Sequence, residues 1–236
     1  MARTPIWKSI AATLTAEIAE AHYAPGEKLP TEASLAARFG VNRHTVRHAL
    51  ASLSESGLIH TRRGAGAFVA QTPADYPIGR RVRFHQNLTA AGRVPAKEVL
   101  TLQTRAAGPR EREALELAEG EDVHVYEGLS LADGQPIALF RSVFPATRFP
   151  TLLSGLNETN SVTAALQGAG VADYTRVSTR LTAKQATATQ ALHLRINEGA
   201  PVLRTVAINA DLDGKRIEYG HTWFAGDRVT LTIGDI

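Results

Sequence analysis

The residues best suited to chemistry gather in one short polar run, which consists of Asn42, Arg43, His44, Thr45 and Arg47. If the run is helical, Arg43 and Arg47 lie one turn apart on a shared face. A guanidinium can donate two hydrogen bonds to O6 and N7 of a guanine in the major groove, and the other side chains suit phosphates or bases. The run therefore predicts contact with double-stranded DNA. The alternative is an ordinary solvated basic face.

Further basic residues and glycines flank this run. They are Arg38 before it, and Arg62, Arg63, Gly64 and Gly66 after it. Arg38 would face the DNA backbone, and the two glycines would let a loop approach DNA closely. Residues 1–70 contain eight Lys or Arg and five Glu, an excess equal to the net charge of +3 of the whole chain. Such a local basic excess is typical of a phosphate-binding surface.

The elements around these residues predict a winged helix-turn-helix over 1–70. Apolar residues at spacings of three and four indicate three helices, and a glycine-rich turn separates two short strands. The helices are expected at 5–21, 31–39 and 43–56, and the strands at 58–62 and 67–70. Gly40 should end the second helix in the left-handed conformation, and Asn42 should cap the third. This order places the polar run at the start of a recognition helix.

A proline-containing segment at 71–79 reads as a linker to a second region, 80–236. That region repeats one pattern, in which a helix precedes two strands joined by Asp-Gly. The first copy has a helix at 109–118 and strands at 123–131 and 136–144, and the second has a helix at 184–194 and strands at 202–212 and 216–224. A final strand is expected at 229–233. Helices between long hairpins predict an α+β domain built on antiparallel strands.

Several classes of function find no support in the sequence. The chain has no cysteine, which excludes disulfides and thiolate zinc sites. Its eight histidines are scattered, and no phosphate loop or nucleophile elbow occurs, so we expect no metal, no cofactor and no catalytic site. The N-terminus lacks an apolar signal core, and no apolar run approaches the roughly 20 residues of a membrane span. The expected location is the cytoplasm.

The first region resembles the GntR family of bacterial regulators. The residues that carry the resemblance are LPTE at 29–32, LAARFGVNRHTVRHAL at 35–50, GLI at 57–59 and GAGAFV at 64–69. The resemblance implies that Arg38, Arg43, Thr45, Arg47 and Gly64 contact DNA. It also implies a homodimer on a palindromic operator, because a two-fold dimer reads two half-sites.

The second region resembles the UTRA domain of HutC-type GntR regulators, whose fold is like chorismate lyase. The motifs are ADGQP at 132–136, DLDG at 211–214, IEY at 217–219 and GDR at 226–228. A narrower resemblance, to regulators of phosphonate-utilisation genes, lies in PIGRRVRFH at 77–85, FPATRFP at 144–150, SVTAAL at 161–166, GVADY at 170–174 and FAGDRV at 224–229. It implies control of phosphonate metabolism and a phosphonate or phosphorylated effector.

An anionic effector would require arginines and other polar side chains. The candidates in the second region are Arg81, Arg83, His85, Arg141, Arg148, Tyr174, Arg176 and Glu218. The resemblance assigns Glu218 to a polar ligand contact. Each arginine could instead form a structural ion pair or a dimer contact. Sugar-phosphate sensors of the subfamily have two arginines where this chain has Gly128 and Ser130, which argues for a different ligand.

Three hypotheses follow from the sequence. The first is a DNA-binding regulator, expected to be a repressor, controlled by a small effector of phosphonate metabolism or of another catabolic operon. The second is a lyase-like enzyme domain fused to a DNA-binding module, which turnover of phosphonates would reveal. The third is a constitutive DNA-binding module whose second domain serves only dimerisation, and ligand-induced thermal stabilisation would separate it from the first.

Overall fold

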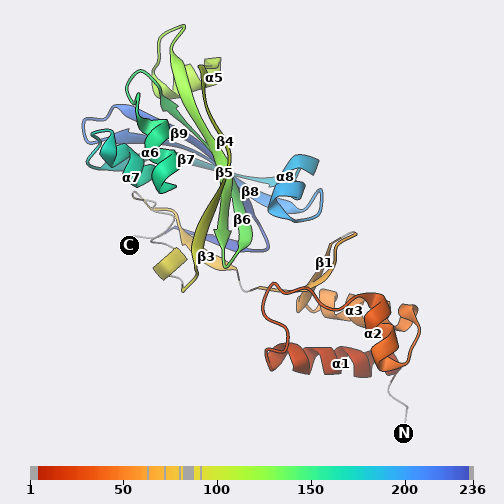
Figure 1. Ribbon diagram of the computed structural model, residues 1–236. Helices are drawn as coiled ribbons and strands as arrows, with labels where there is room; N and C mark the ends of the chain where they lie inside the picture. The colour runs from red at the N-terminus through yellow and green to blue at the C-terminus, as the bar shows by residue number, and fades with distance from the viewer. Residues whose placement is uncertain are drawn as a thin grey trace. The chain divides into compact units, whose positions relative to one another are not determined.

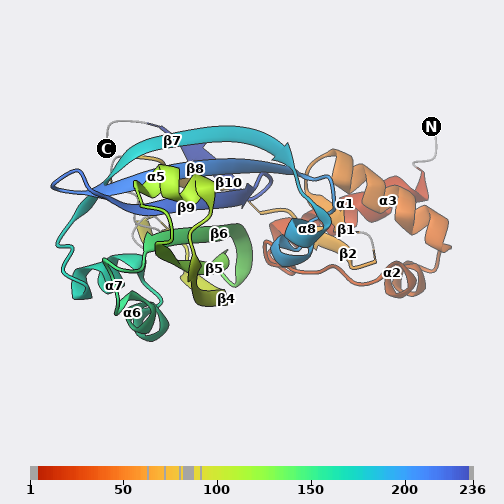
Figure 2. The ribbon, with the colours of Figure 1, turned by 90° about the horizontal axis from the view of Figure 1, so that it is seen from above.

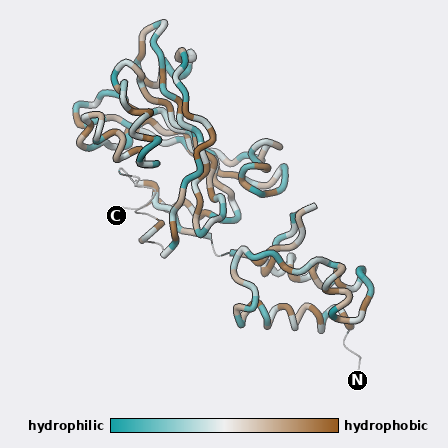
Figure 3. Tube along the Cα trace, viewed as in Figure 1, coloured by the Kyte–Doolittle hydropathy of each residue, from teal (hydrophilic) through white to brown (hydrophobic). Residues whose placement is uncertain are grey.

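The computed structural model of the chain describes residues 5–62, 64–71, 73–79, 81, 88–90 and 92–233. The chain divides into two compact units, Met1–Thr72 and Pro73–Ile236 (Figure 1). Hydrophobic and hydrophilic residues are interspersed along α1 and along the strands of the larger unit (Figure 3). No helix among the described residues is long and apolar enough to cross a bilayer.

The first unit contains three helices and a two-stranded hairpin. These are α1 (Ile6–Ala19), α2 (Glu32–Phe39), α3 (Arg43–Glu55), β1 (Ile59–Arg62) and β2 (Gly66–Val69), with β1 and β2 antiparallel. Buried residues of every element, among them Leu14, Leu35, Val46 and Ile59, form one core. Gly40 follows α2 with a φ of 64°, which confirms the expected left-handed cap. The unit is therefore the expected winged helix-turn-helix.

Six antiparallel strands form the sheet of the second unit, in the order β4-β5-β6-β9-β8-β7. Their bounds are β4 (Pro95–Ala106), β5 (Asp122–Ala132), β6 (Gln135–Pro145), β7 (Tyr174–Gln185), β8 (Pro201–Asp211) and β9 (Arg216–Ala225). The sheet is strongly twisted, as the two views of Figures 1 and 2 show. The two expected hairpins correspond to β5–β6 and β8–β9, which confirms an α+β fold on antiparallel strands.

Helices cover both faces of this sheet because successive strand residues point to opposite sides. Phe140, Phe144 and Ile217 pack against α6 (Leu152–Thr159) and α7 (Val162–Gly168) on one face. Val125 and Val143 pack near α5 (Pro109–Leu115), and Leu139 packs near α8 (Ala188–Leu194), on the other. The helix expected at 184–194 is shorter, since Lys184 pairs with Val202 in the sheet and Thr187 caps α8.

A separate pair of strands joins segments that lie far apart in sequence. β3 (Ala74–Pro77) runs parallel to β10 (Val229–Thr232), with Ala74 opposite Val229. Buried Ala74 and Tyr76 pack with Val229 and Phe224 in one cluster. The range 71–79, expected to be a linker, thus contains a strand. Its partner lies more than 150 residues away, so no local pattern in the sequence indicates it.

Candidate functional site

The start of α3 is held by a side-chain cap. Asn42 has an extended backbone, and its Oδ1 accepts hydrogen bonds from the backbone N–H and the hydroxyl of Thr45, at 2.9 and 3.1 Å. The capping role expected of Asn42 is confirmed. Arg43 and His44 lie exposed in the first turn that this cap fixes. The helix therefore presents an arginine at the end where recognition helices contact bases.

Two other arginines of this surface are paired with carboxylates of neighbouring helices. Arg47 donates to Glu32 through Nε and Nη2, at 3.1 and 2.9 Å. Arg38 donates to Glu17 through both terminal nitrogens and to the Tyr23 hydroxyl. These hydrogen bonds lower the pKa of Glu17 and of Glu32. Both guanidiniums stay largely exposed, so the pairs orient them without removing them from solvent.

The hairpin, which we call the wing, contributes further cations. The Arg62 guanidinium lies 3.5 Å from the centre of the Phe68 ring. Gly64 and Gly66 adopt φ of 74° and 111°, which only glycine tolerates easily. A Cβ on Gly66 would lie 3.0 Å from Cε of Lys28, so this lysine sits against the wing. Lys28 was not among the expected contacts, and Arg63 lies outside the described residues.

A groove separates α3 from the wing within the first unit. Its volume is about 750 Å³, and its charged lining residues are Lys28, Glu32, Arg47, Glu55 and Arg62. Arg47 lies on the recognition helix and Arg62 on the wing, so both walls carry cations. A basic groove beside an exposed helix N-terminus can accept a phosphate backbone.

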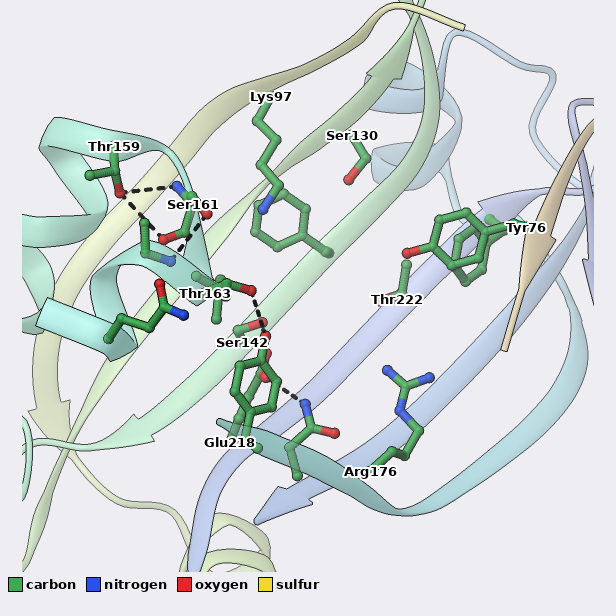
Figure 4. A pocket seen from close by; sticks show the side chains of 17 residues that line it. Tyr76, Lys97, Ser130, Ser142, Thr159, Ser161, Thr163, Arg176, Glu218 and Thr222 are labelled. Atoms are coloured by element: carbon green, nitrogen blue, oxygen red, sulfur yellow. Dashed lines mark hydrogen bonds between the residues drawn. The ribbon is translucent and has the colours of Figure 1, made fainter. Parts of the chain in front are cut away.

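The second unit contains a charged cavity of about 530 Å³ (Figure 4). Three of the expected effector residues, Tyr174, Arg176 and Glu218, line it. The wall also holds Tyr76, Lys97, Ser130, Phe140, Ser142, Thr159, Ser161, Val162, Thr163, Ala164, Gln167, Asn209, Thr222 and Phe224. Most of these lining residues are polar, and three are charged. The volume is in the range of small-molecule sites.

Glu218 is buried at the floor of the cavity with two donors beside it. The Ser142 hydroxyl donates to Oε1 at 2.6 Å, and Asn209 Nδ2 donates to Oε2 at 2.7 Å. Asn209 is only 7 % exposed, and its Oδ1 has no hydrogen-bond partner among the described residues. A buried acceptor without a donor is costly, so this atom marks a place where a donor belongs.

Lys97 reaches the cavity from the edge strand β4. It pairs in register with Ser130 of β5, and its ammonium lies 5.6 Å from the ring centre of Tyr126 and 5.2 Å from that of Phe140. Burial lowers the pKa of Lys97 to about 8, and the nearby Glu218 carboxylate opposes this shift. A cation placed in a cavity despite this desolvation is a candidate for binding an anion.

Arg176 enters from the opposite edge strand, β7, where it pairs in register with Asn209. Its Nε is buried and has no hydrogen-bond partner among the described residues. Figure 4 shows its guanidinium directed toward Thr222 and Tyr76. Burial raises the pKa of Tyr76 well above its ordinary range, so this phenol remains a neutral donor. Lys97 and Arg176 lie on opposite edges of the sheet, and its twist brings both to one cavity.

Three other expected effector residues that the structure describes, Arg81, Arg141 and Arg148, do not line this cavity. Arg81 pairs with Asp173 at 2.5 Å, and Arg148 pairs with Asp211. Arg141 lies on the opposite face of the sheet from its neighbour Ser142, because strand residues alternate in direction. There it contacts the carboxylates of Glu127, at 3.2 Å, and Glu111, at 3.6 Å. Arg83 and His85 lie outside the described residues.

The residues missed by sequence reasoning share one property, which is that long-range pairing places them. Lys97, Asn209 and Tyr76 belong to β4, β8 and β3, and no motif surrounds them. Asn209 could have been found from the second hairpin, since it pairs with Glu218 across strands. No local signal identifies Lys97, because the strand at 95–106 lies at a sheet edge.

Gly128 explains why an arginine is absent from its position. A Cβ built there would lie 2.4 Å from the backbone oxygen of Glu98 and 2.8 Å from Cζ of Phe140. No side chain fits between these two neighbours without a shift of β4 or of the ring. Ser130, the second position, lines the cavity directly opposite Lys97. The positive charge missing from residue 130 is therefore present on the neighbouring strand.

Family models match both units. The model described as bacterial regulatory proteins, gntR family, matches residues 7–69, and the UTRA domain model matches residues 90–230. The HTH-type transcriptional regulator RB1450 of Rhizobium meliloti is 38 % identical over 229 residues, which cover 97 % of this chain and 94 % of the relative. The probable transcriptional regulator PhnF of Escherichia coli is 34 % identical, over 96 % and 94 %.

A solved structure agrees with these matches. The crystal structure of PhnF from Mycobacterium smegmatis superposes with a TM-score of 0.65 at 26 % identity, and the match covers 96 % of this chain and 99 % of that one. The relatives named here are transcriptional regulators. The lyase-like enzyme considered from the sequence therefore finds no counterpart among them.

Proposed function

This chain belongs to the GntR family of bacterial transcriptional regulators and carries a UTRA domain, and from that premise we propose that it represses genes of phosphonate metabolism. In this proposal a homodimer binds a palindromic operator, and a small anionic effector in the UTRA cavity controls the binding. The observation that carries the effector half is the cavity itself, in which two cationic side chains and one carboxylate converge.

The DNA-binding half of the proposal rests on the α3 surface. Arg43 is exposed in the capped first turn, and Arg47 follows one turn later in a fixed orientation. We infer that these two residues contact bases, and that Arg38, His44, Thr45 and the wing contact the backbone. Asn42 serves as the cap, and Arg62, Gly64 and Gly66 shape the wing. Two copies of such a surface would read two half-sites.

The effector half rests on the balance of charge in the cavity. Among its described lining residues, Lys97 and Arg176 are cationic and Glu218 is acidic. The excess positive charge in a poorly solvated site favours an anion. The motifs at 77–85, 144–150 and 224–229, which resemble those of phosphonate-gene regulators, supply the choice of phosphonates among anions. Gly128 supports this choice, since it leaves no room for one of the arginines of the sugar-phosphate sensors.

The position of β3 gives the effector a route to the DNA-binding unit. Tyr76 of β3 lines the cavity, and β3 begins at Ala74, two residues after the boundary at Thr72. A ligand that contacts Tyr76 therefore acts on the strand that continues from the DNA-binding unit. We infer that effector binding changes the preferred arrangement of the two recognition helices, because a ligand shifts the state to which it binds better.

The proposal is tested by operator binding with the purified dimer. Fluorescence anisotropy would compare duplexes from upstream of the encoding gene and of its neighbours with shuffled duplexes of equal composition. We expect a preference of about 10³-fold or more at physiological salt, and a change of affinity when phosphonates are added. Genes for carbon–phosphorus bond cleavage should lie among the neighbours.

Two results would contradict this proposal. Equal affinity for upstream and shuffled duplexes would remove the regulator. A preference for upstream DNA near sugar or histidine catabolism genes, insensitive to every phosphonate, would retain the regulator and transfer it to another catabolic operon.

A further inference from the structure

We propose that the cavity selects a bipolar effector, a phosphonate that carries a primary amine at the end of a short carbon chain. This inference rests on the proposed function of the cavity as the effector site. The phosphonate lies between Lys97 and Arg176, and the ammonium lies against Glu218 and Asn209. Figure 4 shows Lys97, Arg176 and Glu218 at different sides of the cavity. All three line it, and we infer that one small molecule contacts all three.

The anionic end is defined by two cations that come from opposite edges of the sheet. Lys97 stands opposite Ser130 in the register of β4 and β5, and Arg176 has its Nε buried with no hydrogen-bond partner among the described residues. A phosphonate offers three oxygens, enough to accept from an ammonium and a guanidinium together. The Thr222 hydroxyl lies in the direction of the guanidinium and can donate to the same group.

The cationic end is defined by acceptors in excess of donors. Glu218 accepts from Ser142 and Asn209, which leaves further lone pairs on the carboxylate, and Asn209 Oδ1 has no partner among the described residues. A hydroxyl has one donor and could satisfy one of these acceptors. An ammonium has three donors and a positive charge, so it can satisfy the Asn209 oxygen and the carboxylate together. Its charge also compensates that of the buried Glu218.

The two ends have opposite charge, and this sets what the cavity rejects. A simple alkylphosphonate would leave the Asn209 acceptor without a donor, and an alkylamine would leave the buried Nε of Arg176 without an acceptor. Either ligand would bear the cost of unpaired buried groups. The volume of about 530 Å³ exceeds that of the smallest aminophosphonates. Water or a longer spacer would fill the remainder, so the spacer length belongs among the variables of the test.

The test on the ligand side is isothermal titration calorimetry with the full-length dimer. The probes are aminoalkylphosphonates with spacers of two to four carbons, together with ethylphosphonate, 2-hydroxyethylphosphonate and ethylamine. We expect one aminoalkylphosphonate to bind at least tenfold more tightly than ethylphosphonate and 2-hydroxyethylphosphonate, and ethylamine not to bind. If the hydroxyl probe or the plain alkyl probe equals the best amine, the bipolar assignment is overturned.

The test on the protein side joins each end of the ligand to a residue. Glu218→Gln should abolish the advantage of the amine over ethylphosphonate while ethylphosphonate binding persists. Lys97→Met should weaken all phosphonates at least tenfold and keep the advantage of the amine. Lys184→Met is the matched control, since Lys184 is exposed on β7 and does not line the cavity. Thermal unfolding verifies that each variant is folded. If Glu218→Gln does not fold, the ligand series on the unaltered chain tests the bipolar assignment by itself.

The outcomes separate this inference from the function on which it rests. If operator DNA is bound and released by ethylphosphonate as well as by the amines, the regulator stands and the bipolar effector falls. If no phosphonate binds while operator binding persists, both the bipolar effector and the proposed phosphonate effector are rejected, and the DNA-binding regulator remains. If upstream and shuffled duplexes bind equally, the proposed function itself fails, whatever binds in the cavity.

Discussion

The α3 surface and the UTRA cavity arrange their charges in opposite ways. On the surface Arg38 and Arg47 are exposed, and a carboxylate from a neighbouring helix orients each. In the cavity Glu218 is buried, and its partners come from other strands of the sheet. Water and salt screen exposed charges, whereas desolvated ones interact strongly with a ligand. DNA binding by the surface should therefore depend on the number of cations that it presents. Effector binding by the cavity should depend on the position of each charged group.

The largest expected difference between the two sites is their response to salt. Operator affinity should fall by about 10³-fold or more between roughly 50 and 200 mM salt, because phosphate contacts release counterions. Effector affinity should change by no more than about tenfold, because Glu218 and Asn209 are buried and salt screens buried groups less than exposed ones. Anisotropy and calorimetry over the same salt series would measure both. Equal slopes would show that the two sites do not differ as described.

A second prediction concerns the close packing of the backbone at Gly128, beside the cavity. Gly128→Ala should lower the free energy of unfolding by about 3 kcal/mol, since its Cβ would overlap the Glu98 oxygen and the Phe140 ring. Urea denaturation would measure the loss. Gly168→Ala is the matched control, because a Cβ there meets nothing within 4 Å. Unchanged stability of Gly128→Ala would mean that β4 yields easily, and that Gly128 does not exclude an arginine.

A third prediction divides the recognition surface. Arg43→Ala and Arg47→Ala should each weaken operator binding by about 1–3 kcal/mol if they contact guanine. Arg180→Ala, an exposed arginine of β7, is the control and should have no effect. Anisotropy with operator and shuffled duplexes would measure affinity and specificity together. If both variants bind the operator as tightly as the unaltered chain, the assigned surface is rejected.

A fourth prediction concerns pH and acts on the cavity alone. Lys97 has its pKa lowered to about 8, so it is an ammonium below pH 8 and a neutral amine above. The contribution of the Lys97 charge to phosphonate affinity should be constant below pH 8. Above pH 8, loss of this charge should lower the affinity by up to about tenfold, or 1.4 kcal/mol, per pH unit. Lys97→Met serves as the reference, because the ligand and the rest of the cavity are the same in both proteins. Parallel pH profiles for both proteins would exclude Lys97 as the anion partner.

The smallest effect is expected at the cap of α3. Asn42→Ala should cost about 1 kcal/mol of stability, and Asn42→Ser should retain most of it, because serine also accepts from Thr45. Operator affinity should follow stability in both variants. If Asn42→Ser is stable yet binds the operator weakly, Asn42 contacts a base and the cap is not its main role.

The first unit was predictable from sequence because its signals are local. Gly40 and Asn42 act within one turn of their own helices, and the core residues repeat at helical spacing. The hairpins at 122–145 and 201–225 were predictable for the same reason, since an Asp-Gly turn joins each pair of strands. Resemblance to a known family added which of these residues are expected to contact DNA, a property that periodicity does not contain.

The cavity was harder to predict because its walls meet only after folding. Three expected residues, Tyr174, Arg176 and Glu218, do line it. Lys97 was missed because β4 is an edge strand with no fully buried residue, so its sequence does not show a clear buried face. Arg141 does not line the cavity, because it lies one residue from Ser142 and therefore on the other face of the sheet. Side-chain direction depends on register, and single-residue chemistry does not reveal register.

The parallel pairing of β3 with β10 has a consequence for synthesis. The described core residues of the winged helix-turn-helix all lie within 5–69, so this unit can fold once that stretch has left the ribosome. The segment bearing Tyr76, by contrast, waits for residues 229–232 before it has a strand to pair with. During synthesis, the winged helix-turn-helix can therefore fold well before β3, which carries Tyr76, has its partner strand β10.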